Sequence, residues 1–466
     1  MIIPNMQEKN TAQPANDVSP QTIAAKILAM DIGEKTVLIN FNGGFLSSDA
    51  GALLLREVEE QIGLIRKMAE VIPDSRDARY ITHKITELLI QRVAQIACGY
   101  EDANDCDTLR HDPIFKMIAG RYPEFGEALA SQPTMSRFEN SITRTTLYRL
   151  ARVFADIFIA SYEEPPELII LDFDDTDDPV HGKQQLSLFN NYYKEQCYLP
   201  LHVYEGLSGK LITTILKPGK RCTGQQMLSI VKRVIGHLRA AWPKTVILFR
   251  GDSHFAYPEV MNWIEAQNNV HYLTGLTKNS RLEKEVQPVV DRAQRRYARS
   301  GEDVKLFHAF LYQADTWSKP RRVIAKIEVS AKGVNLRFVV TDIRGGTAAQ
   351  IYIEFYCARG EAELYIKDHK LYLKSDRTSC NEFEANQFRV FLHSAAYVLL
   401  HTLKTNVLKH TEFATATINT IQLRLLKIGA RIRECKTRIV VELPSQYPLK
   451  ELLLRGFQIF TLLRST

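Results

Sequence analysis

Residues 168–178 read LIILDFDDTDD, an apolar run that leads into five aspartates. The apolar half is typical of a buried strand. Because side chains alternate along a strand, Ile169, Leu171 and Phe173 share one face, and Asp172 and Asp174 share the other. Two chemistries fit this pattern. Asp172 can act as a nucleophile with Asp174 as acid and base, as in a magnesium-dependent phosphatase, or one aspartate can bind a metal ion in a nuclease.

A second acid ends another apolar run, TVILFRGDSHF at residues 245–255. This run predicts a buried strand with Asp252 at its C-terminal end. Between the two strands, residues 198–216 predict a β-hairpin around GLSG, and residues 222–242 predict an amphipathic helix. The resulting order of strand, hairpin, helix and strand favours the nuclease over the phosphatase.

The third group of chemically useful residues lies in YCARGEAELYIKDHK at 356–370. Arg359, Glu363 and Lys370 follow Tyr356 at offsets of three, seven and fourteen residues. At about 100° per residue, these positions fall within an arc of roughly 60° on one helix face. A carboxylate flanked by cations can bind a metal ion beside DNA phosphates. The alternative is an ordinary solvent-exposed helix with ion pairs along one face.

The pattern Y-(2)-R-(3)-E-(6)-K resembles the signature around the last catalytic acid of a large group of bacterial insertion-sequence DDE transposases. The four residues from Tyr356 to Lys370 match this signature position by position. Other segments are similar to parts of such transposases in the same order, and the resemblance covers roughly residues 40–460: SRFENS, LDFDDTDDPVHG, FRGDSHF and ANQFRVFLHSAAYVLL.

This resemblance implies an α/β fold with a ribonuclease-H-like mixed sheet and flanking helices, a β-rich insertion domain and a helical N-terminal DNA-binding region. It implies that Asp174, Asp252 and Glu363 are the catalytic residues and the metal ligands. Asp174 matches the D-x-T form with Thr176. Asp172 projects from the same face of the strand, however, so the choice between the two aspartates stays open at this point.

The resemblance also implies two Mg²⁺ ions, for which Mn²⁺ can substitute. Phosphodiester cleavage develops negative charge on the attacking and the leaving oxygen, and a pair of divalent ions can stabilise both. Mg²⁺ prefers carboxylate oxygens and water as ligands. Tyr356, Arg359 and Lys370 would hold the flanking phosphates, since arginine can bind a phosphate through two hydrogen bonds. The implied partner is double-stranded DNA, both element ends and target DNA, bound by a homodimer.

Helical spacing, alternation and charge divide the chain into several regions, and the resemblance implies the roles of these regions. The predicted regions are a flexible leader at 1–30, a mostly helical DNA-binding region at 31–163, a catalytic core at 164–269 and 356–410, a β-rich insertion at 270–355 and a basic C-terminal region at 411–466.

Basic residues outside the helix face are candidate DNA contacts. Arg137 lies in LASQPTMSRFENS, which fits either a helix-turn-helix or a plain helical bundle. Basic clusters in the insertion could follow the DNA backbone through counterion release, or could be solvated surface. These clusters include Arg295, Arg296, Arg321 and Arg322. Trp317 could stack on an unpaired base, and the alternative for it is a packing role.

The bulk composition sets further limits. The chain has 466 residues, 45% of them hydrophobic, and a net charge of +7, which permits binding to a polyanion. Seven scattered cysteines predict reduced thiols, and neither a secretory signal nor a membrane span is evident. The composition predicts a cytoplasmic protein, and the resemblance implies a bacterial one that associates with the nucleoid through DNA. An inactive or domesticated DNA-binding relative and a phosphatase that uses Asp172 remain as alternatives.

Overall fold

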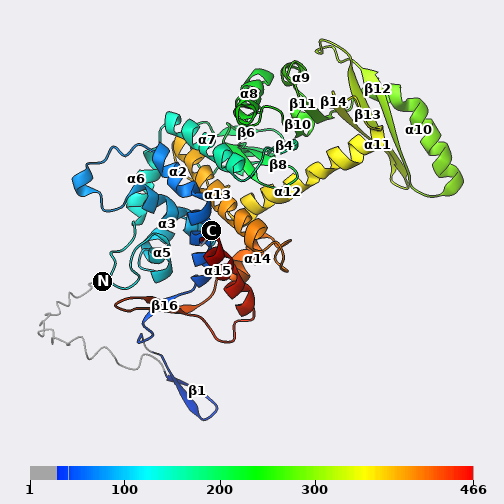
Figure 1. Ribbon diagram of the computed structural model, residues 1–466. Helices are drawn as coiled ribbons and strands as arrows, with labels where there is room; N and C mark the ends of the chain where they lie inside the picture. Colours follow the sequence, from blue (N-terminus) through cyan, green and yellow to red (C-terminus); the bar gives the residue numbers. More distant parts are fainter. Residues whose placement is uncertain (1–28, 40, 465–466) are drawn as a thin grey trace, which may run out of the picture.

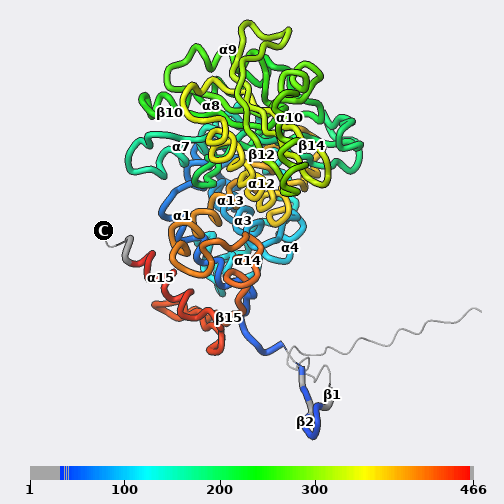
Figure 2. Tube along the Cα trace, turned by 90° about the vertical axis from the view of Figure 1, so that its right-hand side faces the viewer, coloured from blue at the N-terminus to red at the C-terminus, as the bar shows by residue number. Residues whose placement is uncertain are grey.

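The computed structural model describes residues 29–39 and 41–464. The predicted leader at 1–30 therefore lies almost entirely outside the described residues. Figure 1 shows a helical lobe on one side of the long helix α13 (Phe383–Thr402) and a lobe built on a large sheet on the other. Figure 2, turned by 90°, shows the same division, with the sheet lobe above the helical lobe.

The large sheet has eight strands in the order β12-β13-β14-β11-β10-β4-β8-β9. These strands are β4 (Leu168–Asp175), β8 (Leu201–Glu205), β9 (Leu211–Ile215), β10 (Val246–Gly251), β11 (Val270–Leu276), β12 (Val304–Tyr312), β13 (Arg321–Ser330) and β14 (Gly333–Thr341). β10 pairs in parallel with both β4 and β11, and the other pairs are antiparallel. The chain is therefore a mixed α/β protein.

The predicted order of strand, hairpin, helix and strand is confirmed. β8 and β9 form the antiparallel hairpin. The helix α8 (Gly224–Ala241) begins with a capping box between Thr223 and Gln226, in which each side chain accepts a hydrogen bond from the other residue's backbone N–H. β10 then ends one residue before Asp252. This connection brings the two aspartate-bearing strands, β4 and β10, side by side.

The predicted alternation along β4 is also confirmed. Ile169, Leu171 and Phe173 share one apolar core with side chains of α8. Ile170 projects to the opposite side and shares a second apolar cluster with Tyr352, which lies in a helical segment after β14. Apolar side chains are thus buried on both faces of β4, and this double burial fixes the direction in which the aspartates of β4 project.

The predicted β-rich insertion at 270–355 contains the strands β11 to β14, which belong to the large sheet. Between β11 and β12 lies a 21-residue helix, α10 (Ser280–Ser300), which the sequence prediction missed. Its buried side chains recur at helical spacing and pack on the sheet: Leu282, Val286, Val289, Val290 and Ala293. Figure 1 shows α10 and β12 at the far end of the sheet lobe.

The helical lobe contains α1 (Leu53–Ile62), α2 (Leu64–Val71), α3 (Ile85–Ala97), α4 (Asp105–Leu109), α5 (Pro113–Ile118), α6 (Gln132–Asn140) and α7 (Arg144–Ala160). The C-terminal region adds β15 (Ala430–Glu434), β16 (Ile439–Glu442) and α15 (Lys450–Arg464). β15 pairs with β16 and with β3 (Phe45–Ser47), so this region closes a small sheet that the sequence prediction did not include. None of the described helices is long and apolar enough to cross a lipid bilayer.

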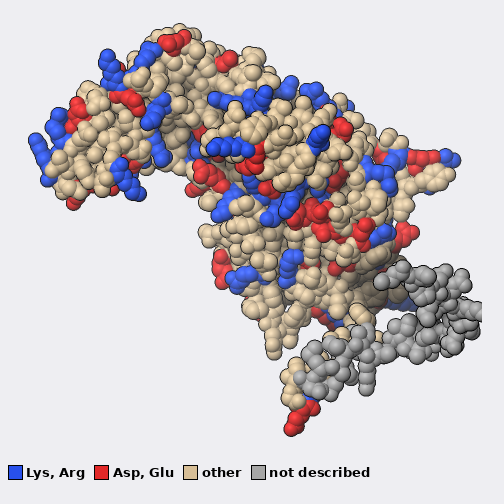
Figure 3. Space-filling view, turned by 180° about the vertical axis from the view of Figure 1, so that it is seen from behind, with Lys and Arg blue, Asp and Glu red and all other residues tan. Residues whose placement is uncertain are grey.

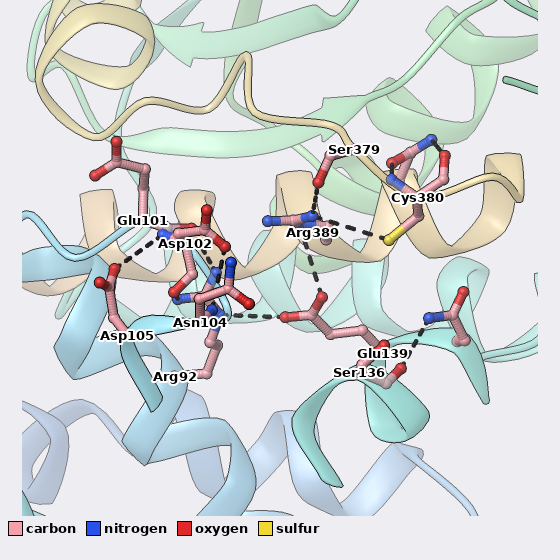
Figure 4. A network of polar contacts seen from close by, with 12 residues as sticks. Arg92, Glu101, Asp102, Asn104, Asp105, Ser136, Glu139, Ser379, Cys380 and Arg389 are labelled. Atoms are coloured by element: carbon pink, nitrogen blue, oxygen red, sulfur yellow. Dashed lines mark hydrogen bonds and ion pairs between the residues drawn. The ribbon is translucent and has the colours of Figure 1, made fainter. Parts of the chain in front are cut away.

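A buried charge network joins three helices of this lobe (Figure 4). Glu139 on α6, part of the SRFENS segment, is 2% exposed. One of its oxygens accepts a hydrogen bond from Nε of Arg92 on α3 at 3.1 Å, and the other lies 3.7 Å from Nε of Arg389 on α13. Charges this deeply buried require their partners, so the network fixes α6 against the two longer helices.

Candidate active site

Asp174 lies on β4, and Asp252 follows directly after the end of the neighbouring parallel strand β10. Arg250 of β10 pairs in register with Asp172 of β4, so two residues further on the chain reaches Asp252 beside Asp174. The side chain of Asp252 is 33% exposed, and its Oδ1 accepts a hydrogen bond from the backbone N–H of His254 at 2.7 Å. Two carboxylates that are far apart in sequence therefore come together at one edge of the sheet.

Glu363 comes from a continuous helical segment at residues 348–372, which changes its winding along its length. A π-helical stretch (Ile351–Tyr356) and a 3-10 turn (Cys357–Arg359) precede α12 (Gly360–Lys367). The sequence prediction assumed a uniform 100° per residue. The changes of winding alter the angle between Tyr356 and Glu363, and π-helical stretches of this kind are frequent at functional sites.

The guanidinium of Arg359 lies between two of the three predicted acids. Its Nη1 donates a hydrogen bond to Oδ2 of Asp174 at 2.9 Å, and its Nη2 donates to Oε1 of Glu363 at 3.3 Å. The side chain of Asp174 is 14% exposed, whereas that of Glu363 is 66% exposed. The structure thus brings Asp174 and Glu363 to one shared cation, and the Glu363 carboxylate is open to solvent.

The charges of the three acids act on one another. Burial, together with the carboxylates of Asp252 and Glu363 and of a neighbouring aspartate, raises the pKa of Asp174 to about 7, although Arg359 acts in the opposite direction. Burial also raises the pKa of the Tyr356 phenol, which lies near Arg359 and Asp252. Carboxylates that repel one another in a partly buried site are stabilised by an added cation.

Two lysines neutralise other aspartates at this end of the sheet. Nζ of Lys370, the last residue of the helical pattern, lies 2.8 Å from Oδ1 of Asp177. Nζ of Lys217 donates to both oxygens of Asp175 at 2.6 and 2.7 Å. Contact between Lys370 and a DNA phosphate would therefore require Lys370 to leave its present carboxylate partner.

The chemistry of the donor set fits a hard divalent cation, because three carboxylates supply the oxygen ligands that such ions prefer. Within the described residues, however, no three His, Cys, Asp or Glu side chains are arranged closely enough to hold an ion. Arg359 lies between Asp174 and Glu363 instead. Binding of a metal ion by these residues would require the guanidinium to move and the exposed Glu363 side chain to turn inward.

Asp172 has a different environment from Asp174. It is 1% exposed, and both of its oxygens accept hydrogen bonds from the fully buried Arg250, at 2.5 and 2.6 Å. A nucleophile must reach its substrate, and this carboxylate is closed off on both oxygens. The geometry therefore argues against the phosphatase that uses Asp172, and favours Asp174 as the metal-binding aspartate of β4.

The residues predicted to contact DNA fall into two groups. Arg137, Arg295 and Arg296 are exposed. Arg322 is partly buried and donates hydrogen bonds to backbone carbonyls of residues 343–346. The three exposed side chains can reach a phosphate without a change in the fold, whereas Arg322 holds a turn of the chain.

Arg321 and Trp317 are interior residues, which argues against the predicted DNA contacts for both. Arg321 is 3% exposed, and its Nε donates to Oε1 of Glu265 at 2.7 Å. Its guanidinium lies 5.1 Å from the ring centre of Trp317, which is 6% exposed. These contacts favour the packing role that was the alternative for Trp317, and they bind Arg321 to a buried acid.

Sequence reasoning missed the contribution of Arg250. Its signal in the sequence is an arginine inside an apolar strand run, FRGDSHF, because a charge buried in a sheet needs an acidic partner. The identity of that partner, Asp172, depends on the parallel pairing of β4 with β10, which the sequence alone does not display.

Most of the chain matches the model of a known protein family. The family model described as "Transposase DDE domain group 1" matches residues 30–465. The sequence has no match among curated proteins. One similar solved structure is titled "Cryo-EM structure of piggyBac transposase synaptic complex with hairpin DNA", with 11% sequence identity, coverage of 82% of this chain and 80% of that chain, and a TM-score of 0.42. That likeness is too distant to support a conclusion, and neither match distinguishes the Y-R-E-K group.

Proposed function

The chain belongs to the family described as Transposase DDE domain group 1, and we propose that it cuts the ends of its own insertion sequence and joins them to target DNA. The observation that carries this proposal is the grouping of Asp174, Asp252 and Glu363 around Arg359. The three acids come from β4, β10 and the helical segment at 348–372, and the charge of each acts on the same guanidinium.

The sheet supports the proposal of a ribonuclease-H-like core. In the order β9-β8-β4-β10-β11, a hairpin lies beside the first acid-bearing strand, and a helix connects it to the parallel strand that carries the second acid. We assign residues 164–269 and 356–410 to this core, with 270–355 as an insertion that lengthens its sheet. Residues 31–163 would then form the DNA-binding region.

The proposed chemistry is two successive phosphoryl transfers at one site. Asp174, Asp252 and Glu363 would hold two divalent ions, Mg²⁺ with Mn²⁺ as a substitute, which supply activation of water and stabilisation of the leaving 3′-oxygen. Arg359, once released from the carboxylates, would bind a phosphate beside the cut through two hydrogen bonds. Tyr356 would donate to the same strand, and Lys370 would neutralise a flanking phosphate.

The proposed partner is double-stranded DNA in two forms, the inverted ends of the element and the target. Arg137, Arg295 and Arg296 are exposed and would add phosphate contacts away from the cut. Because two DNA ends must be held together for joining, we propose that the protein acts as a homodimer on DNA. The setting that this implies is a bacterial cytoplasm.

The finer assignment to the bacterial Y-R-E-K group rests on four residues. Tyr356, Arg359, Glu363 and Lys370 carry the signature, and the contacts of Arg359 and Lys370 with acids at the strand ends are consistent with a shared role. All three acids are present, so an inactive DNA-binding relative is the less favoured alternative.

The test is cleavage of a DNA fragment that contains the coding region and its flanks, in Mg²⁺ and in Mn²⁺. We expect cuts at two inverted sequences outside the gene. The variants Asp174→Asn, Asp252→Asn and Glu363→Gln should each lower the cleavage rate by at least about 100-fold, equivalent to about 2.7 kcal/mol of transition-state stabilisation. Glu361→Gln, on the exposed surface of the same helix, is the matched control and should cut at the rate of the wild type.

If any of the three acid variants cleaves DNA at the rate of the wild type, the substituted residue is not catalytic. Tight binding to the ends without any cleavage by the wild type would favour the inactive relative. Phosphate release from small phosphomonoesters, lost only in Asp172→Asn, would support the phosphatase instead.

A further inference from the structure

A fully buried ion pair lies directly beneath the proposed site. Nε and Nη2 of Arg250 donate to Oδ1 and Oδ2 of Asp172 at 2.5 and 2.6 Å. The side chains are 0% and 1% exposed. Two parallel hydrogen bonds between a guanidinium and a carboxylate fix both the separation and the orientation of the groups that carry them. The pair therefore fixes β10 against β4 through side chains as well as through the backbone ladder.

The third nitrogen of the same guanidinium reaches a third element. Nη1 of Arg250 donates to the carbonyl oxygen of Phe355, in the π-helical stretch immediately before Tyr356. One side chain is thus bonded to β10, to β4 and to the helical segment at 348–372. Each of these three elements carries one proposed metal ligand.

The distances along the chain are short in the two strands. Asp174 follows Asp172 by two residues, and Asp252 follows Arg250 by two residues. Glu363 lies two helical turns beyond Phe355. A shift of the Arg250 guanidinium would therefore be transmitted over one pleat to each aspartate and along the helical segment at 348–372 to the glutamate.

Gly206 closes the remaining side of the ion pair. Its N–H donates to the carbonyl oxygen of Ile170 at 2.8 Å. A Cβ atom at this position would lie 2.6 Å from Nη2 of Arg250 and 2.6 Å from Oδ2 of Asp172. Any larger residue would thus push directly on the ion pair, and glycine is the residue that leaves it undisturbed.

We propose that Asp172 and Arg250 are positioning residues, which set the spacing of Asp174, Asp252 and Glu363 through the three elements that they join. The inference rests on the proposed function, since it assigns a role relative to those acids. A buried pair that only stabilised the fold would need no contact with the third element, whereas this one bonds all the elements that carry ligands.

The experiment compares two buried arginines of similar surroundings. Arg250→Lys keeps the charge but loses the planar group that donates to three oxygens, two of Asp172 and one of Phe355. Arg92→Lys is the matched control, because Arg92 is also 0% exposed, pairs with Glu139 and donates to backbone carbonyls of residues 100–102, all within the helical lobe. Thermal unfolding, Mn²⁺ affinity by calorimetry and affinity for end DNA are measured for both variants and the wild type.

We expect both variants to unfold at lower temperature than the wild type. Only Arg250→Lys should lose Mn²⁺ affinity, by about 10- to 100-fold, as is usual when a residue that orients metal ligands is changed. Affinity for end DNA without metal should stay close to that of the wild type, because no DNA contact is removed. Wild-type Mn²⁺ affinity in folded Arg250→Lys, or an equal loss in Arg92→Lys, would overturn the positioning role.

A second pair of variants keeps every charged group. Gly206→Ala should lower Mn²⁺ affinity by crowding the ion pair, while Gly236→Ala on α8, where a Cβ meets no atom within 4 Å, should leave it unchanged. Unchanged affinity in folded Gly206→Ala would also overturn the inference. A wrong proposed function would give a different result. The Mn²⁺ affinity would then be the same in the wild type and in Asp174→Asn.

Discussion

Arg359 contacts two of the proposed metal ligands, Asp174 and Glu363, and its charge is influenced by the third, Asp252. A guanidinium among three carboxylates neutralises charge that a pair of divalent ions would otherwise neutralise. At the scale of the residue, the site is therefore an acidic cluster with its own counterion. The same side chain is suited to phosphate once a metal ion takes its place.

Replacement of Arg359 with Gln removes this counterion. Because the carboxylates then repel one another, we expect the variant to unfold at a lower temperature than the wild type in EDTA, and to be stabilised more strongly by Mn²⁺. Scanning calorimetry with and without Mn²⁺ measures both effects. Arg149→Gln, at an exposed position on α7, is the control. A smaller response of Arg359→Gln to Mn²⁺ than that of the wild type would contradict the counterion role.

Sequence reasoning reached the correct face of β4 but not the distinction between its two aspartates. Alternation alone predicts that Asp172 and Asp174 project together. Their environments differ because Arg250, 78 residues away in sequence, lies beside only one of them. For the same reason Arg321 was predicted to be a surface residue, since its partner Glu265 lies 56 residues away.

At the scale of the element, the helical segment at 348–372 and the helix α10 were the hardest parts to predict. The first includes π-helical and 3-10 stretches, and a calculation at fixed angular spacing does not include such changes. The second is interrupted in sequence by Pro288 and is strongly charged, which weakened its helical signal. The hairpin, α8 and β10 followed the expected periodicities and were confirmed.

The exposed face of α10 carries a row of arginines at spacings of three and four residues: Arg292, Arg295, Arg296 and Arg299. None of these four has an ion-pair partner among the described residues, and Figure 3 shows Lys and Arg gathered at the end of the lobe that carries α10. Such a row matches a DNA backbone, because each phosphate contact releases counterions.

Replacement of Arg295 and Arg296 by Gln should therefore weaken DNA binding. The plot of log affinity against log salt concentration, which falls with salt, should become shallower by about 1 to 2 in slope. Fluorescence anisotropy over a series of salt concentrations measures this slope. Arg281→Gln is the control, since Arg281 lies on the same helix and already pairs with Asp315 at 2.7 Å. An unchanged slope in the double variant would show that this face does not meet DNA.

Glu59, at the corner between α1 and α2, should make the stability of the folded protein depend on pH. Oε1 of Glu59 accepts hydrogen bonds from the N–H groups of Ile65 and Arg66 at 2.9 and 3.2 Å. Burial raises the pKa of Glu59 from 4.5 to about 7, although these backbone hydrogen bonds act in the opposite direction. The folded protein therefore keeps this proton at a pH where the unfolded chain has lost it.

Stability contributed by protonated Glu59 is thus complete below pH 4.5 and is lost as the pH rises through about 7. Glu59→Gln removes this dependence. Relative to the variant, the wild type should lose on the order of 1–2 kcal/mol of unfolding free energy between about pH 5 and about pH 8. Denaturant unfolding at both pH values measures the difference. A parallel response of the two proteins would show that Glu59 is ionised throughout.

At the scale of the whole molecule, each lobe is held together by contacts between residues that are far apart in the chain. The parallel pairing of β10 with β4 and β11 unites the sheet, and the network of Arg92, Glu139 and Arg389 unites the helices. Periodicity predicted individual strands and helices of the sheet lobe and the helical N-terminal region, and the family resemblance implied the α/β fold. They did not predict which strands are neighbours, since strand order depends on contacts between residues far apart in the chain.

Glu139→Gln tests the network in the helical lobe. It leaves two buried guanidiniums without their shared acid, and loss of one partner of a buried ion pair costs about 3–5 kcal/mol. We expect a clear fall in unfolding temperature, while any surviving folded protein should bind Mn²⁺ like the wild type. Glu127→Gln, at an exposed position in the same lobe, serves as the control. A change in unfolding temperature no larger than that of the control would contradict this assignment.

Anomalous X-ray scattering from Mn²⁺, in crystals of the protein bound to its end DNA, would locate the metal ions and their ligands directly. We predict anomalous peaks within bonding distance of carboxylate oxygens of Asp174, Asp252 and Glu363, with the Arg359 guanidinium moved onto a DNA phosphate. Peaks bound by other residues, or the same Arg359 contacts with Asp174 and Glu363 in fully loaded crystals, would contradict the account.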